Sequence, residues 1–258
     1  MTRESFIELR SRFLNWKAEG KKIASLTAYD YPTARLLDEA GVDFLLIGDS
    51  LGMVVLGYPD TIDVTVEDMI HHTKAVARGC KRAVVIADMP YKSYETPQQA
   101  VETAKRLEDA GAQCVKLEGG RAILPQIEAI LNANIPILAH LGMLPQHVRE
   151  EGGYHIKGKV EAEQKALLED ALTLEKVGVL GTVLELVKHD LAGEISRALK
   201  IPTIGIGAGS NCDGQILVTH DLIGYFPWFV PKHVKQILHI GENIREGVRK
   251  WVEELKRS

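Results

Sequence analysis

Carboxylates and histidines lie at the ends of many short apolar runs in this sequence. In chain order they are Asp30, Asp49, Asp88, Glu118, His140, Glu185 and His220. If the runs are parallel strands of one barrel, their C-terminal ends meet at a common mouth. Carboxylates gathered there would repel one another, and a divalent cation is the ordinary way to neutralise them. Because most of these side chains offer oxygen, the pattern favours magnesium or manganese over zinc.

Each of these acids also has a structural interpretation. A single aspartate after an apolar run serves equally well as a helix N-cap or a turn former. That interpretation weakens where Asp49, Asp88 and Glu118 end three consecutive runs, because neighbouring strands of a barrel place such residues side by side. We therefore take these three carboxylates as the candidate cation site.

Lys116 is a candidate for offsetting negative charge at this site. It lies two residues before Glu118, so strand periodicity places both side chains on one face. An inward lysine beside three acids would balance part of their charge. A plain salt bridge between Lys116 and Glu118 is the alternative.

A glycine-rich run, GIGAG, spans residues 205–209. Phosphate sites of barrels often follow the seventh and eighth strands, which is where this run would fall. Glycines at such a place serve equally well for a tight bend or a close approach of the backbone. The run alone does not decide between these interpretations.

Eight apolar runs are the elements that would position these groups: residues 23–30, 44–50, 83–90, 114–120, 136–142, 182–187, 203–209 and 215–221. Their Val, Ile and Leu content without strict alternation is typical of parallel strands covered on both faces. Segments with helical spacing separate them, and several end on glycine. Eight such units in 258 residues predict one TIM (β/α)₈ barrel over residues 1–258, in preference to an open doubly wound sheet.

Two further helices and two long connections complete the prediction. Residues 3–18 have helical spacing and could close the barrel floor, while residues 231–256 predict a charged helix packed outside. The connections 51–65 and 143–159 are longer than the links require. They are either lids over the site or packed surface loops.

Composition excludes several classes of protein. The formal net charge is −4 and the basic residues are scattered, which argues against nucleic acid as the main partner. No apolar run approaches the roughly 20 residues that cross a bilayer, and the opening MTRESFIELR is charged, so we expect no membrane segment and a cytoplasmic protein. Cys80, Cys114 and Cys212 lie far apart, as reduced structural thiols do.

Nine motifs between about Lys22 and about Lys235 are more specific than any of these patterns. They are LTAYDYPTARLLDEAGVD, GDSLGMVVLGY, TVEDMIHHTKAVARG, ADMPYKSY, VKLEGG, HLGMLPQ, GGYHIKGK, IPTIGIGAGSNCDGQILVTHD and PKHVK. Taken together, they resemble those of the ketopantoate hydroxymethyltransferase family, also called 3-methyl-2-oxobutanoate hydroxymethyltransferase. The resemblance implies a TIM barrel of the phosphoenolpyruvate/pyruvate type.

The resemblance also implies a role for each candidate residue. Asp49 and Asp88 match magnesium ligands, and Glu118 would complete the metal site directly or through water. Ser50 and Lys116 match groups that hold the substrate carboxylate, beside Asp49 and Asp88. Glu185 matches the catalytic base.

The reaction implied is the transfer of a hydroxymethyl group from 5,10-methylenetetrahydrofolate to 3-methyl-2-oxobutanoate, giving ketopantoate. It would pass through a magnesium-stabilised enolate and belongs to pantothenate and coenzyme A biosynthesis. The resemblance further implies a homo-oligomer, commonly a homodecamer, whose partners are otherwise the small 2-oxo acid and the folate.

Three departures from the family pattern accompany these matches. Leu144 stands where the family usually has Thr, Leu186-Val187-Lys188 replaces a common Cys-Val-Pro, and Tyr91-Lys92 replaces a common Phe-Met. Alternatives that stay open are a folate-independent lyase or mutase of the same barrel superfamily, a phosphate-binding barrel isomerase, and a catalytically silent barrel that acts as a scaffold.

Overall fold

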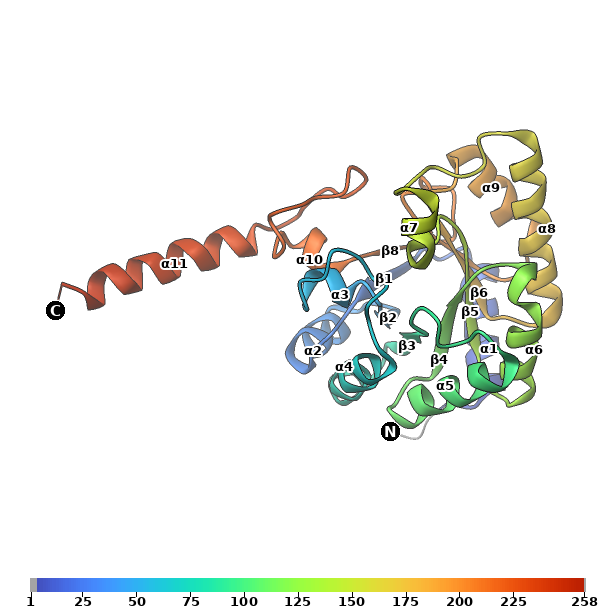
Figure 1. The fold of residues 1–258 in the computed structure, drawn as a ribbon, viewed down its shortest axis with the longest axis horizontal. Helices are drawn as coiled ribbons and strands as arrows, with labels where there is room; N and C mark the ends of the chain where they lie inside the picture. Colours follow the sequence, from blue (N-terminus) through green and yellow to red (C-terminus); the bar gives the residue numbers. More distant parts are fainter. Residues whose placement is uncertain (1–3, 258) are drawn as a thin grey trace. The chain divides into compact units, whose positions relative to one another are not determined.

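The computed structural model describes residues 4–257. Within this part of the chain, eight strands form a closed barrel in chain order, and each strand is parallel to the next (Figure 1). The strands are β1 (Ile23–Thr27), β2 (Phe44–Ile47), β3 (Val84–Asp88), β4 (Cys114–Glu118), β5 (Ile137–Gly142), β6 (Gly181–Glu185), β7 (Thr203–Ile206) and β8 (Gly214–Leu217). The predicted TIM barrel is confirmed, and each predicted run overlaps one strand.

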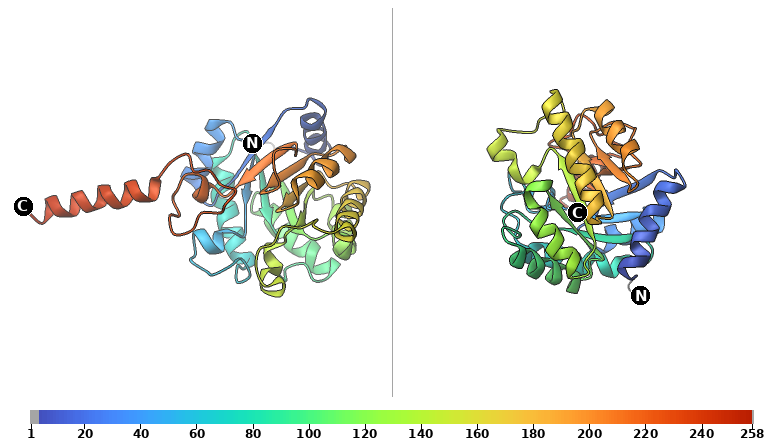
Figure 2. Two further views of the ribbon diagram at one scale, coloured as in Figure 1. Left: turned by 90° about the horizontal axis from the view of Figure 1, so that it is seen from above. Right: turned by 90° about the vertical axis from the view of Figure 1, so that its right-hand side faces the viewer.

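Helices lie around the outside of this barrel (Figure 2). One buried apolar cluster joins outward strand residues such as Leu45 and Val85 to helix residues such as Met69 and Leu107. The helices of the barrel unit are α2 (Tyr31–Ala40), α3 (Leu51–Val54), α4 (Val66–Gly79), α5 (Pro97–Asp109), η1 (Arg121–Ile123), α6 (Leu124–Asn132), η2 (Pro145–His147), α7 (Val148–Glu151), α8 (Glu161–Val177) and α9 (His189–Ala198). Strands β2, β3 and β4 are buried along their whole length, as strands covered on both faces are, whereas Ala24 in β1 and Gln215 in β8 are exposed.

Helix α1 (Phe6–Ala18) precedes the first strand and closes the barrel floor, as predicted. Its Leu9, Phe13 and Trp16 belong to a second buried cluster, which also contains the first residues of several strands. The rings of Phe13 and Phe44 have their centroids 6.4 Å apart. Residue 3, the predicted start of this helix, lies outside the described residues.

Replacing Phe13 with alanine is expected to lower the free energy of unfolding by about 3–5 kcal/mol. The Phe13 side chain is fully buried, so its loss removes apolar contact and leaves a cavity under the barrel. Urea unfolding measures the change, with Ile7→Ala as the control because Ile7 is exposed on the same helix. Equal losses in the two variants would contradict a sealing role for Phe13.

All the predicted runs except the fifth extend past the observed strands at their C-terminal ends. The first run was predicted to Asp30, but β1 ends at Thr27 and Asp30 is the N-cap of α2, where its carboxylate accepts a hydrogen bond from the Thr33 amide. The last run was predicted over 215–221, but β8 ends at Leu217 and a short helix, α10 (Thr219–Leu222), follows. For Asp30 the helix-cap interpretation is therefore correct.

The described chain divides into two compact units, one up to Ile216 and one from Leu217 onward. The second unit contains α10 and α11 (Ile240–Leu255), and no residue of α11 is buried. The helix predicted over 231–256 begins only at residue 240. In the segment before it, the Ile237 amide donates to the carbonyl of Leu222, and the first two amides of α11, those of Ile240 and Gly241, donate to the carbonyls of Ile223 and Gly224. These bonds to residues 222–224 take the place of bonds within a helix that began earlier.

No helix of residues 4–257 is both long enough and apolar enough to span a membrane. A single domain over residues 1–258 stays a prediction.

Candidate functional site

The C-terminal mouth of the barrel gathers the predicted carboxylates. Asp88, Glu118 and Glu185 are the last residues of β3, β4 and β6, and Asp49 lies two residues beyond the end of β2. Asp49, Asp88 and Glu118 are buried, while the Glu185 side chain keeps 15% of its surface exposed. Parallel strands in register explain this convergence, because equivalent ends of neighbouring strands lie at one edge.

Asp49, Asp88 and Lys116 are in direct contact. The Asp49 amide donates a hydrogen bond of 3.1 Å to Oδ2 of Asp88. The Nζ atom of Lys116 lies 2.9 Å from Oδ1 of Asp88 and 3.9 Å from Oε1 of Glu118. Lys116 therefore pairs more closely with Asp88 than with Glu118, the partner that spacing in the sequence had suggested.

His140 connects Glu185 to this cluster. Its Nδ1 atom lies 3.4 Å from Nζ of Lys116 and 3.5 Å from Oε1 of Glu118, while its Nε2 atom lies 3.4 Å from Oε2 of Glu185. Burial, together with the nearby Lys116 ammonium, lowers the pKa of His140, so the ring is neutral at physiological pH. A neutral imidazole thus separates the Glu185 carboxyl from the other acids.

The mouth holds more acidic groups than basic ones. Burial, followed by the charges of Asp88 and Glu118, raises the pKa of Asp49 well above its ordinary range. Burial alone would lower the pKa of Lys116, but the surrounding carboxylates outweigh it and raise that pKa. One ammonium thus faces four acidic groups.

This donor set fits magnesium, which prefers oxygen ligands and needs only one or two carboxylates besides water and substrate. Across residues 4–257, no three or more His, Cys, Asp and Glu side chains are grouped so that they could hold one metal ion. The sequence predicts Asp49 and Asp88 as the direct ligands, with Glu118 completing the site directly or through water. These roles stay predictions.

Glu185 has the pKa of a base that works near neutrality. Burial, followed by the charge of Glu118, raises the pKa of Glu185 from 4.5 to about 8, and Lys116 opposes the shift. A carboxyl with such a pKa exchanges protons readily at physiological pH. The value agrees with the role that the sequence predicts for this residue.

The raised pKa of Glu185 predicts a pH-dependent contribution to stability in the metal-free protein. Between pH 4.5 and about 8 the folded state keeps a proton that the unfolded state has released, so the contribution is complete below pH 4.5 and is lost as pH rises to about 8. Glu185→Gln cannot titrate, and its stability relative to wild type should therefore rise with pH. Urea unfolding of both proteins near pH 5 and near pH 8 measures this, and an unchanged difference would contradict the shift.

The backbone after Glu185 is held in an uncommon conformation. Leu186 has φ 47°, a left-handed value that costs about 1–2 kcal/mol for a residue with a side chain. Its amide donates to Ile206 O and its carbonyl accepts from the Lys157 amide, at 2.9 and 2.8 Å. The Lys188 amide also donates to Lys157 O, a bond that the proline common in the family at this position could not make.

Ser50 lies at the rim of the mouth. Its Oγ atom is 2.8 Å from the hydroxyl of Tyr29, a buried residue that follows β1. The structure thus brings Ser50 next to Asp49 by chain continuity, and its predicted contact with a substrate carboxylate stays a prediction. Tyr29 is a neighbour that the sequence analysis missed, although it belongs to the motif LTAYDY.

The two long connections are joined to each other. Arg149, in α7, forms ion pairs with Asp60 at 2.7 Å and Asp63 at 3.2 Å. These contacts tie the 143–159 connection to the 51–65 connection. Both connections contain short helices, so the packed-loop interpretation describes them in this structure, and a lid motion stays a prediction.

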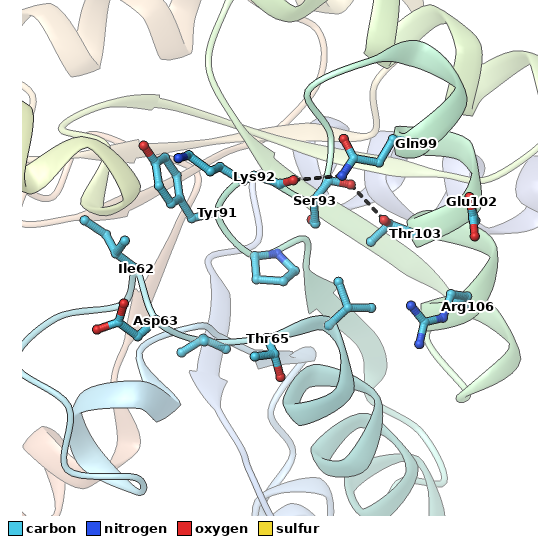
Figure 3. Close-up of a pocket in the computed structure, with 13 residues that line it drawn as sticks. Ile62, Asp63, Thr65, Tyr91, Lys92, Ser93, Gln99, Glu102, Thr103 and Arg106 are labelled. Carbon is cyan, nitrogen blue, oxygen red and sulfur yellow. Dashed lines mark hydrogen bonds between the residues drawn. The ribbon is translucent and has the colours of Figure 1, made fainter.

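A pocket of about 440 Å³ lies near the mouth, between the segments around Ile62 and Tyr91 and the helix α5 (Figure 3). Its lining includes Lys92, Ser93 and Arg106, and none of the predicted site residues. The buried hydroxyl of Ser93 has no hydrogen-bond partner in the described part of the chain. This pocket is therefore separate from the carboxylate cluster.

The glycine run 205–209 has a packing explanation. Gly209 has φ 81°, and a Cβ atom there would lie 2.7 Å from the ring of His189. At Gly205 a Cβ atom would lie 3.0 Å from Sγ of Cys212. Both positions need glycine for conformation or space, which supports the structural interpretation of the run.

Two of the strand-end candidates lie outside the carboxylate cluster. Asp30 caps α2, and His220 belongs to α10 in the second unit.

A closed parallel barrel with ionisable side chains buried at its C-terminal mouth defines an enzyme of the TIM-barrel class. A solved structure, 2,3-dimethylmalate lyase, a member of the PEP mutase/isocitrate lyase superfamily, shares the fold with a TM-score of 0.63. It is 16% identical, and the match covers 97% of this chain and 88% of that chain.

Residues 9–258 match the ketopantoate hydroxymethyltransferase family, and the chain belongs to it. The 3-methyl-2-oxobutanoate hydroxymethyltransferase of Acetivibrio thermocellus is 54% identical over 246 residues, which are 95% of this chain and 87% of that protein. The protein of the same name from Caldicellulosiruptor saccharolyticus is 52% identical over 242 residues, or 93% of this chain and 92% of its own length. The predicted family and the transferase class of enzyme are confirmed.

Proposed function

We propose that this protein transfers a hydroxymethyl group from 5,10-methylenetetrahydrofolate to 3-methyl-2-oxobutanoate, giving ketopantoate for pantothenate and coenzyme A biosynthesis. The observation that supports this most directly is the placement of Glu185. Its carboxyl has a pKa of about 8 and faces the Lys116 and carboxylate cluster across His140. Glu185 can act as a base on one side of the mouth, and Lys116 can balance charge on the other. This arrangement suits the removal of a proton from a bound 2-oxo acid.

Magnesium, when bound, would supply Lewis-acid chemistry that draws charge onto the keto oxygen and acidifies the C3 hydrogen. Asp49 and Asp88 would hold the ion, with Glu118 acting directly or through water. These carboxylates and the substrate carboxylate are anionic, so the ion also offsets charge that Lys116 cannot balance alone.

Glu185 removes the proton from C3 of the 2-oxo acid, and the electron pair of that C–H bond becomes the enolate. Negative charge grows on the substrate at this step, and Lys116 offsets part of it from its position beside Asp88. The enolate carbon then bonds to the one-carbon unit of the folate. Water adds its hydroxyl to the same carbon, and both bonds from that carbon to the folate nitrogens break. The remaining proton of the water and the proton taken from C3 end on those nitrogens, and tetrahydrofolate leaves.

Ser50 and Lys116 would hold the substrate carboxylate, which orients C3 toward Glu185. Burial of Asp49, Asp88 and Lys116 keeps bulk water away from the charges and makes their interactions stronger. Both effects fix the geometry before the proton moves.

One incubation tests the proposal. The protein is mixed with magnesium, 5,10-methylenetetrahydrofolate and 3-methyl-2-oxobutanoate, and ketopantoate is measured by mass spectrometry. Product should form only when the folate is present. Turnover of the 2-oxo acid without folate would favour the lyase or mutase, and the absence of any turnover would favour a silent barrel.

The proposal includes a cytoplasmic homo-oligomer, with the decamer common in this family as the expected form. An exposed apolar stripe on α11 supports a further copy as partner: Ile244, Val248, Trp251 and Leu255. These residues recur at three- and four-residue intervals and so share one face of the helix. Analytical ultracentrifugation tests this, and a monomer at micromolar concentration would reject it.

A further inference from the structure

Gln146 is a buried neighbour of the carboxylates at the mouth. It lies in η2, at the start of the 143–159 connection, and its side chain is buried. A buried glutamine is costly unless its amide is hydrogen-bonded, so its partners indicate what it does.

The side-chain amide of Gln146 has three partners. Its Nε2 atom donates to Oδ2 of Asp49 and to the carbonyl of Met89, both at 2.9 Å. Its Oε1 atom accepts a hydrogen bond of 2.5 Å from the hydroxyl of Tyr94. The opposite orientation of the amide would turn its oxygen toward two acceptors, so these contacts specify one orientation.

Tyr94 is itself buried, and burial raises the pKa of its hydroxyl, which therefore stays protonated and able to donate. The donor cannot be replaced by bulk water at this depth. Tyr94 thus secures the Gln146 amide from the side opposite Asp49.

The backbone of Gln146 reaches a second carboxylate. Its amide donates a hydrogen bond of 3.0 Å to Oε2 of Glu118. One residue therefore holds one oxygen of Asp49 and one oxygen of Glu118. The second oxygen of Glu118 is the one that faces Lys116 and His140.

We propose that Gln146, with its amide fixed by Tyr94, is the positioning residue that orients Asp49 and Glu118 for a divalent cation. It does not touch the reacting atoms. By holding Oδ2 of Asp49 and Oε2 of Glu118, it fixes the orientation of both carboxyl groups. The inference rests on the proposed function only in so far as these acids bind a cation.

This arrangement also couples the site to the 143–159 connection. Met143 and Gln146 both lie in this connection, and the Met143 amide donates a hydrogen bond of 2.8 Å to the carbonyl of Glu185. The connection therefore contacts Glu185 as well as Asp49 and Glu118. Any displacement of the segment would withdraw the donors of Asp49 and Glu118 together. Outer hydrogen bonds of this kind commonly change metal affinity or activity 10- to 100-fold when they are removed.

Titration calorimetry of Mn²⁺ into the metal-free protein, without substrate, tests the proposal. Gln146→Met keeps the length of the side chain and removes its donors, and we expect the affinity to fall about 10- to 100-fold. Tyr94→Phe removes one oxygen and should cause a smaller loss. Gln126→Met and Tyr91→Phe are matched controls outside the cluster and should bind as wild type does.

A double-mutant cycle separates positioning from general loss of stability. If Tyr94 acts through Gln146, the double variant should bind Mn²⁺ as weakly as Gln146→Met alone. Additive losses would overturn the role of Tyr94. Wild-type affinity in Gln146→Met would overturn the proposal, as would a wild-type protein that binds no Mn²⁺.

If Gln146→Met does not fold, as circular dichroism would show, Tyr94→Phe decides the matter, and unchanged affinity there overturns the proposal. The test does not depend on turnover. A protein that binds Mn²⁺ as expected but forms no ketopantoate would reject the proposed function and leave the role of Gln146 intact.

Discussion

Glu185→Gln is expected to abolish the exchange of the C3 hydrogen of 3-methyl-2-oxobutanoate with deuterated water. A positioned general base contributes typically 10²- to 10⁴-fold, and glutamine has the shape of glutamate without its basicity. We therefore expect the exchange rate, followed by proton NMR with magnesium present, to fall at least about 100-fold. The pKa of about 8 is the property that the substitution removes.

Binding must be measured in the same variant. Magnesium-dependent binding of the 2-oxo acid should persist in Glu185→Gln, since Lys116, Asp49 and Asp88 are unchanged. Glu169→Gln is the control, because Glu169 pairs with Arg121 on an outer helix and should leave exchange unaltered. Exchange at the wild-type rate in Glu185→Gln would assign the base to another residue.

The double variant Asp49→Asn, Asp88→Asn is expected to lose divalent-cation binding altogether. It removes two of the acids that raise the local negative charge, and it leaves Lys116 as a repelling cation beside Glu118. Titration calorimetry with Mg²⁺ and Mn²⁺ measures the loss. Each single variant should bind more weakly than wild type and more tightly than the double variant.

Asp30→Asn is the matched control for this experiment. Asp30 also ends an apolar run, but it caps α2, and asparagine is an equally good N-cap. Its cation binding and its stability should stay close to those of wild type. Cation binding that survives in the double variant would place the metal elsewhere.

Sequence periodicity was sufficient for the fold. Eight apolar runs separated by helical segments predicted eight parallel strands, and each run overlaps one. The information is local, because a strand covered on both faces must be apolar throughout. The C-terminal strand limits were less accurate, since Asp30 and residues 219–221 continue the pattern of the runs but make hydrogen bonds that begin helices.

The candidate carboxylates were also predictable. Parallel strands bring their C-terminal ends to one mouth, so Asp49, Asp88, Glu118 and Glu185 could be assigned to a common site by their places alone. The ion pair that Lys116 forms within that site could not be predicted from the sequence. Lys116 lies nearer to Asp88 than to Glu118 because the contact crosses between strands, and spacing along one strand does not report it.

By itself, then, the sequence of this protein determined which segments are strands and which acids end them, because these properties depend on neighbours in the chain. Only the tertiary structure decided that Asp30 is a helix cap, that Gln146 and Tyr94 stand behind Asp49, and that Glu185 has a pKa of about 8. These last properties arise from burial and from charges on other strands. Residues distant in sequence supply both, and no local pattern contains them.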